Sequence, residues 1–135
     1  MERLPRVARY IVDETRVEPR AVAGIGTAAR GIIYDLCTEQ NVDSEALVIS
    51  LAIFHPGYAT VGHGAHPDRE HAYYILSGEM TIVMEDEERV AKAGQVIFFP
   101  RGVVHDTRND GSEDVRLLIV RTLVRSGPIA PAPNR

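Results

Sequence analysis

The sequence predicts an all-β fold, and three observations carry this prediction. Short runs rich in β-branched and aromatic residues recur along the chain, with turns that contain Gly or Pro between them. Residues 95–99 form one such run, bounded by Gly94 and Pro100, which is typical of a buried strand. Residues 47–54, LVISLAIF, are apolar on both faces, as expected for a strand in the middle of a two-layer sheet or barrel.

Length, composition and charge indicate one ordinary globular domain. The chain has 135 residues, of which 44% are hydrophobic and 25% charged, enough to bury a core of its own. The net charge of -4 argues against binding to the phosphate backbone of a nucleic acid. Residues 1–10 lack the apolar core of a signal peptide, and the longest apolar run, residues 46–54, is far shorter than the ~20 residues of a membrane helix. We therefore expect a cytoplasmic protein with neither a nucleic-acid nor a membrane partner.

Two strands are predicted before residues 47–54. Residues 7–12 and 31–36 have the composition of strands and are separated by a Gly/Ala-rich connection. The single cysteine, Cys37, cannot form an intramolecular disulfide, and we expect it to be a small buried thiol. Over the whole chain, the expected core contains Leu47, Ile49, Leu51, Ile53, Ile82, Ile97, Leu117 and Ile119.

Histidines cluster before the next predicted strand. His63, His66 and His71 fall within nine positions of one another. Strict alternation would send His63 and His66 to opposite faces of a strand, so both point inward only if the strand carries a bulge. Gly62 and Gly64, which flank His63, are residues that tolerate a bulge.

The strand that follows His71 sorts its side chains by alternation. Tyr73 and Ile75 share the face of His71, whereas Tyr74 and Leu76 are expected to face the other layer. Because it shares a face with the histidine, Tyr73 is a candidate for the lining of a substrate pocket. A hairpin turn at residues 77–78 then leads into a strand at residues 80–84.

A further histidine is placed by the stretch from residue 94 to residue 109. Pro100 and Gly102 make a turn after the strand at residues 95–99. In the extended run that follows, alternation puts Val103, His105 and Thr107 on one face. A last strand is expected at residues 115–124, followed by a mobile Pro-rich tail at residues 126–135.

The spacing of these residues resembles the two motifs of the cupin superfamily. The second motif is matched at all five of its fixed positions, Gly94, Pro100, Gly102, His105 and Asn109. The first motif is matched at both flanks, by Gly57 and Gly78, with two departures between them. His63 and His66 are separated by two residues where the family has one, and His71 stands where the family has Glu.

The resemblance implies a cupin double-stranded β-helix, also called a jelly-roll barrel. It implies a single domain at residues 1–125, with the barrel core at about residues 46–121, and a homodimer. It also implies a small-molecule substrate.

The histidines predict a metal site. His63, His66, His71 and His105 would bring four imidazoles to one cavity, and imidazole suits zinc, nickel, copper and iron but not calcium or magnesium. We expect a divalent transition metal, with zinc ranked first and iron or nickel as alternatives. His55 lies outside both motifs and is expected to be structural.

Three functions remain open at this stage. The first is a metal-dependent enzyme of the cyclase or isomerase type, in which the metal acts as a Lewis acid on an oxygen of an aromatic or polyketide-like substrate. Small cupins that resemble aromatic polyketide cyclases, together with the neutral ligand His71, favour this reading. The second is a dioxygenase that uses Fe(II) or Ni(II), and the third is a ligand-sensing or storage cupin without turnover. No catalytic residue beyond the metal ligands is predicted.

Overall fold

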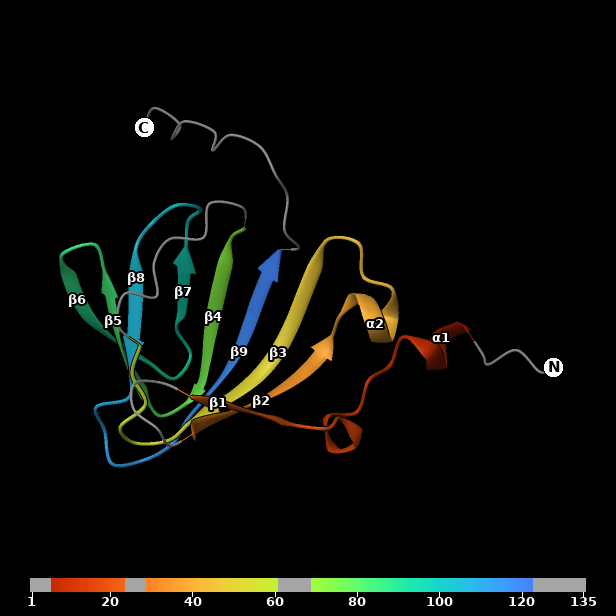
Figure 1. Cartoon of the computed structure of the whole chain (residues 1–135), viewed down its shortest axis with the longest axis horizontal. Helices are drawn as coiled ribbons and strands as arrows, with labels where there is room; N and C mark the ends of the chain where they lie inside the picture. Colours follow the sequence, from red (N-terminus) through yellow and green to blue (C-terminus); the bar gives the residue numbers. More distant parts are fainter. Residues whose placement is uncertain (1–5, 24–28, 61–68, 123–135) are drawn as a thin grey trace.

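The computed structural model describes residues 6–23, 29–60 and 69–122, and these form two antiparallel sheets (Figure 1). The larger sheet has six strands in the order β1-β2-β3-β9-β4-β7, and the smaller sheet has three in the order β6-β5-β8. The larger sheet contains β1 (Arg20–Ala23), β2 (Ala29–Cys37), β3 (Leu47–Phe54), β4 (His71–Ser77), β7 (Val96–Phe99) and β9 (Val115–Thr122). The smaller sheet contains β5 (Glu79–Met84), β6 (Glu87–Lys92) and β8 (His105–Arg108). The all-β prediction is confirmed.

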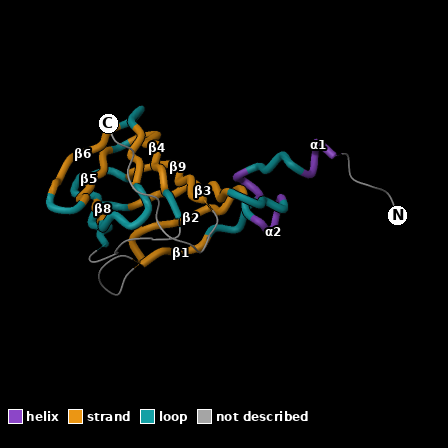
Figure 2. The backbone as a smooth tube through the Cα atoms, turned by 90° about the horizontal axis from the view of Figure 1, so that it is seen from above, coloured by secondary structure: helices purple, strands orange, loops and turns teal. Residues whose placement is uncertain are grey.

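The helices in the described ranges are short. They are α1 (Arg6–Arg9), a 3-10 turn η1 (Glu14–Arg16), and α2 (Glu39–Val42), which starts in a capping box formed by Thr38 and Asn41. Figure 2 shows α1 beyond α2, away from the strands. None of these helices is long and apolar enough to cross a membrane.

The first predicted strand, at residues 7–12, is wrong. This segment begins in α1 and continues as coil, with Val7 and Ile11 exposed by 72% and 70%. A strand needs a neighbouring strand to hydrogen-bond its backbone groups. The position beside β2 is occupied by β1, which lies in the segment that was expected to be a connection. The second predicted strand, residues 31–36, is confirmed within β2, at whose end Cys37 is only half-buried.

The core lies on the face of the larger sheet that meets the smaller sheet. In β3 the buried positions on this face are Val48, Ser50, Ala52 and Phe54. The expected core positions of β3 are therefore corrected: Leu47 is 40% exposed, Ile49 and Ile53 are half-buried, and Leu51 is buried on the opposite face. When a strand is apolar on both faces, its sequence does not show which face points inward. In β3 this is decided by the register with β9. The other expected core residues hold, since Ile82, Leu117 and Ile119 are buried and Ile97 packs against the core.

Alternation along β4 is confirmed on its inner face. His71, Tyr73 and Ile75 are all buried. Tyr74 and Leu76 are 42% and 39% exposed, so the expectation that they face another layer is wrong. The layer that covers β4 lies on the histidine side alone, as far as the described residues show.

The glycine of the turn between β4 and β5 has a backbone reason for its identity. Gly78 has a φ of +83°, and a Cβ at this position would lie 2.5 Å from the carbonyl oxygen of Asp114. Only glycine fits such a turn without strain. The hairpin predicted at residues 77–78 is wrong, because β4 pairs with β7 and β9 whereas β5 pairs with β6 and β8, so this turn carries the chain from the larger sheet to the smaller one.

Asn109 joins the end of β8 to the turn that follows β3. Its side chain is buried, and Nδ2 donates to the carbonyl oxygens of Phe54 and Glu113, both at 2.8 Å. Oδ1 accepts from the backbone N–H of Gly111 at 3.0 Å, and the backbone N–H of Asn109 donates to the carbonyl of Tyr58 at 2.8 Å. One amide thus ties together two segments that are far apart in the sequence.

The segment before residue 61 runs along β8. Ala59 pairs with Arg108 in an antiparallel bridge, and the N–H of Thr60 donates to the carbonyl of Thr107 at 3.0 Å. The hydroxyl of Thr60 donates to Asp106 at 2.9 Å. Because the pairing is antiparallel, the chain at Thr60 is directed toward the start of β8, where His105 lies.

Candidate functional site

Four strand ends meet at one end of the barrel, at the top of Figure 1. β4 begins there with His71, β7 ends there with Phe99, β8 begins there with His105, and β9 ends one residue after Arg121. The register confirms this arrangement, since His71 is the cross-strand partner of both Phe99 and Arg121. The chemistry-bearing side chains therefore gather at a single end.

His71 and His105 face each other from opposite sheets. They are 8% and 3% exposed, and their ring centroids lie 6.1 Å apart, with the ring planes inclined by 69°. With a metal–nitrogen bond of about 2.1 Å, two imidazoles on one ion have centroids about 5.3 Å apart at a tetrahedral angle and up to about 6.5 Å apart at a linear one. The observed separation lies between these values, so both rings reach one ion at an angle wider than tetrahedral.

The tautomer of His105 is set by the backbone. Nδ1 lies 3.0 Å from the carbonyl oxygen of Val103. Because a carbonyl oxygen only accepts, Nδ1 carries the proton, and in the neutral ring Nε2 keeps its lone pair. A hydrogen bond from one ring nitrogen to a carbonyl is the arrangement that orients a metal-binding histidine and raises its basicity.

Aromatic rings form one wall beside the histidines. Phe99 stacks on His105 with centroids 4.3 Å apart, and Tyr73 contacts Phe99 edge-on at 4.8 Å. Tyr73 is buried, and this burial, with a smaller contribution from Tyr58, raises the pKa of its phenol far above the usual value. The phenol therefore stays protonated and is available as a hydrogen-bond donor.

A polar cluster continues the inner face toward β2. The carboxylate of Asp35 accepts from Nε of Arg20 at 2.7 Å and from the hydroxyl of Ser50 at 2.8 Å. The hydrogen bond from Arg20 is the main reason why the pKa of Asp35 lies below its usual value. Asp35 is therefore an ionised, internally satisfied group and not a candidate proton donor.

Arg121 is a site residue that the sequence analysis missed. Leu117, Ile119 and Arg121 occupy alternate positions of β9, so the alternation that makes the first two core residues also points Arg121 inward. Arg121 lines a cavity of about 270 Å³ together with Val48 and Arg69. A charged residue in phase with core positions is the signal that would have identified it.

Two of the four predicted ligands are not tested. His63 and His66 lie outside the described residues, as does the bulge expected at Gly62 and Gly64. Of the predicted set, the structure brings together His71 and His105. Within residues 6–23, 29–60 and 69–122, no group of three or more His, Cys, Asp or Glu side chains is placed to hold a metal ion.

His55 lies at the opposite end of the barrel. It follows the last residue of β3, and its Nδ1 is 2.9 Å from Asp114, which precedes the first residue of β9. This position supports the structural role expected for His55 and separates it from the other two described histidines.

The comparison with protein families agrees with this architecture. Residues 50–121, just over half of the chain, match the family described as the cupin domain. The chain belongs to the cupin family. The resemblance inferred from the two histidine motifs is thus confirmed.

Several proteins resemble this cupin along most of its length. It is 27% identical over 124 residues to the polyketide synthase CurC of Streptomyces cyaneus, a match that covers 92% of this chain and 73% of CurC. It is 27% identical over 104 residues to the protein SchB of Streptomyces halstedii, which covers 77% of this chain and 71% of SchB. Among solved structures, the polyketide cyclase RemF from Streptomyces resistomycificus has a TM-score of 0.73 at 24% identity, with 90% and 86% of the two chains covered. A predicted oxalate decarboxylase from Thermotoga maritima has the same TM-score and identity, with 84% and 99% covered. At this level of identity, the two structures show a shared fold.

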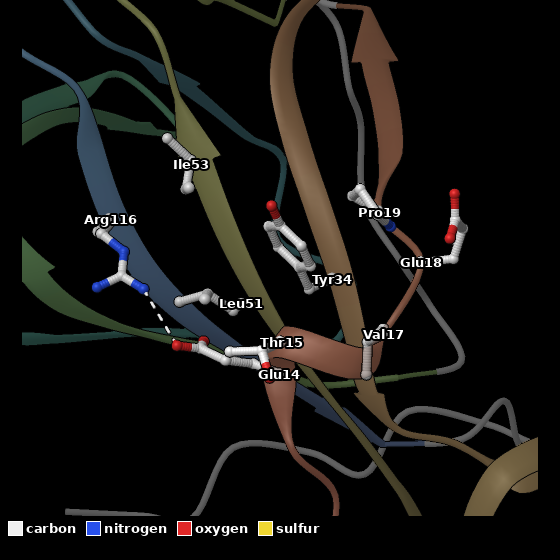
Figure 3. A pocket seen from close by; sticks show the side chains of 9 residues that line it. All are labelled: Glu14, Thr15, Val17, Glu18, Pro19, Tyr34, Leu51, Ile53 and Arg116. Atoms are coloured by element: carbon white, nitrogen blue, oxygen red, sulfur yellow. Dashed lines mark ion pairs between the residues drawn. The ribbon is translucent and has the colours of Figure 1, made fainter.

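A different cavity of this cupin lies on the outer face of the larger sheet. Its volume is about 390 Å³, and it lies between residues 14–19 and the sheet, as Figure 3 shows. Leu51 and Ile53 form its floor, and Arg116 reaches Glu14 across it at 3.6 Å. These residues point away from the histidines, so the cavity marks how the N-terminal segment covers the sheet and is not part of the candidate site.

Proposed function

We propose that this cupin is a metal-dependent enzyme of the cyclase or isomerase type that acts on an aromatic or polyketide-like small molecule. The observation that carries the proposal is the buried pair His71 and His105, with the tautomer of His105 set by Val103. The names of two similar proteins, a polyketide synthase and a polyketide cyclase, support this substrate class.

The proposed metal ligands are His63, His66, His71 and His105. The chain leaves the described residues at Thr60, beside β8, and re-enters them at Arg69, two residues before His71. Both points border the candidate site, which supports a ligand set completed from the intervening segment. A bound divalent ion, with zinc ranked before iron or nickel, would supply Lewis-acid polarisation of a carbonyl or enolate oxygen.

The identity of residue 71 bears on the charge of the site. His71 is a neutral ligand at a position where the family motif has Glu, so the site lacks one negative charge. A site with more net positive charge stabilises a developing enolate better and stabilises oxidised iron less well. This balance favours a reaction that involves no change of oxidation state.

The remaining groups position the substrate and its protons. Tyr73, whose phenol stays protonated, donates a hydrogen bond to a substrate oxygen. Phe99 stacks on His105 and excludes water from the inner side of the pair. The core of Ile75, Leu117 and Ile119 below it keeps this end of the barrel dry and rigid.

The test is a turnover assay with a linear aromatic polyketide substrate under defined metal and oxygen conditions. The zinc-loaded protein should be active, and its rate should be unchanged without oxygen, because a Lewis acid never changes oxidation state. His71→Glu should lower turnover while keeping metal bound.

Two outcomes would overturn the proposal. Oxygen consumption stoichiometric with product, or activity that requires iron or nickel, would favour a dioxygenase. Purified protein without metal or turnover would point to a sensing or storage cupin.

We also propose that the protein is a homodimer. The outer face of the larger sheet carries exposed apolar side chains on β4, β7 and β9, namely Tyr74, Leu76, Val96, Phe98 and Val120. A second copy of the chain would remove this face from water.

A further inference from the structure

Arg121 occupies the position next to His71 on the inner face of the larger sheet. Its cross-strand partners are His71 on β4 and Val48 on β3. Residues that are directly opposite each other in antiparallel strands have Cβ atoms about 4.5–5.5 Å apart on the same face. The guanidinium and the imidazole therefore start from neighbouring points of one surface.

The cavity beside Arg121 has room for a small ligand. It measures about 270 Å³, and its lining includes two arginines, Arg69 and Arg121. Two carboxylates, those of Asp35 and Glu39, also line it. Asp35 is already bonded to Arg20 and Ser50, so its charge is largely satisfied within the protein.

Arg121 is held in surroundings that disfavour its charge. Its side chain makes no hydrogen bond or ion pair with another residue in the described part of the chain. Burial lowers the pKa of Arg121, and the positive charges of Arg69 and Arg20 add to this effect, against the opposing influence of Asp35. Because arginine stays protonated in proteins, the charge remains and the site is suited to an anion.

We propose that Arg121, with Arg69 beside it, forms an anion-binding subsite that holds the carboxylate of a small aromatic substrate next to His71 and His105. A planar guanidinium matches a planar carboxylate with two parallel hydrogen bonds. The aromatic wall of Phe99 and His105 lies at the same end of the barrel and provides a flat surface for the ring. The reference to a substrate rests on the proposed function, whereas the anion site itself does not.

Calorimetric titration with salicylate tests the subsite, and salicylamide serves as the neutral analogue. The titration is made on the protein as purified and after removal of metal with a chelator, because a carboxylate also binds metal ions. We expect salicylate to bind in both cases and salicylamide to bind much more weakly. Arg121→Met should weaken salicylate binding by about ten- to a hundredfold. Arg121→Lys, which keeps the charge but loses the bidentate geometry, should fall between the two.

Arg89→Met is the matched control, since Arg89 is an exposed arginine on β6 in the smaller sheet. It should bind salicylate as the unaltered protein does.

Four outcomes decide the proposal. Equal binding of salicylate by Arg121→Met and the unaltered protein, or equal binding of salicylate and salicylamide, would overturn the subsite. If binding disappears on chelation and is indifferent to Arg121→Met, the carboxylate sits on the metal, and the subsite fails while the proposed function stands. If salicylate binding depends on Arg121 but no turnover is found, the proposed function fails and the subsite stands. If Arg121→Met does not melt cooperatively, Arg121→Lys decides: binding unchanged from the unaltered protein overturns the proposal.

Discussion

His71 and His105 lie at one end of the barrel, and His55 lies at the other. His55 therefore serves as the control in a test of which histidines bind metal. His71→Ala or His105→Ala should reduce the metal content of the purified protein severely, because each removes an imidazole from the proposed site. His55→Ala should leave the metal content unchanged. Elemental analysis of the three variants, with melting curves to confirm folding, measures the effect. Equal loss in all three would contradict the ligand assignment.

At the same scale, the sequence predicts some side-chain directions well. His105 and Thr107 are buried as alternation requires, and so are His71 and Tyr73. In each strand the histidine of the family motif fixes the phase, because the composition of the strand, HDTR or HAYYILS, does not fix it. Arg121 follows the same alternation along β9, but it was not predicted as a site residue, because an arginine at the end of an apolar strand is usually exposed.

Among the elements, the connection between β8 and the turn after β3 depends on Asn109. Its amide makes three hydrogen bonds to backbone groups, one buried and two partly buried, each worth about 1 kcal/mol net, so Asn109→Ala should lower the free energy of unfolding by about 3 kcal/mol. Urea unfolding followed by circular dichroism measures the loss. Asn41→Ala, at the exposed cap of α2, is the control and should cost about 1 kcal/mol. If Asn109→Ala lowers the free energy of unfolding less than Asn41→Ala does, the amide of Asn109 does not hold β8 to the turn after β3.

The elements also show where sequence reasoning ends. The turn at residues 100–102 and the presence of a strand before it were predictable because Pro and Gly have few backbone options. The expectation that this strand is buried is wrong on its outer face, where Val96 and Phe98 are 62% and 50% exposed. β1 was not, because RAVA lacks a strong strand pattern and forms only where the edge of β2 is free to pair. The inward face of β3 was not predictable either, since Leu47 and Val48 are equally apolar and pairing with β9 decides between them.

For the whole molecule, the apolar outer face of the larger sheet predicts the oligomeric state. Phe98 is 50% exposed, and its neighbours in register, Ala72 on β4 and then Val120 on β9, continue an apolar row across three strands. Light scattering should give the mass of a homodimer, and Phe98→Glu should shift it to a monomer by placing a charge in the apolar contact. Val90→Glu, at an exposed position on β6 in the smaller sheet, should remain a dimer. A monomer in the unaltered protein at high concentration would refute this assembly.

His71 and His105 belong to different sheets, His71 to the larger and His105 to the smaller. The distance between their rings is therefore not set by any one strand but by how far apart the two sheets are held. Ile75 and Leu117 on one sheet and Met80 on the other fill that gap. These core side chains therefore set the separation of the two imidazole rings. In the proposed metal site, larger or smaller side chains at these core positions should change the size of the ion that fits while His71 and His105 stay in place.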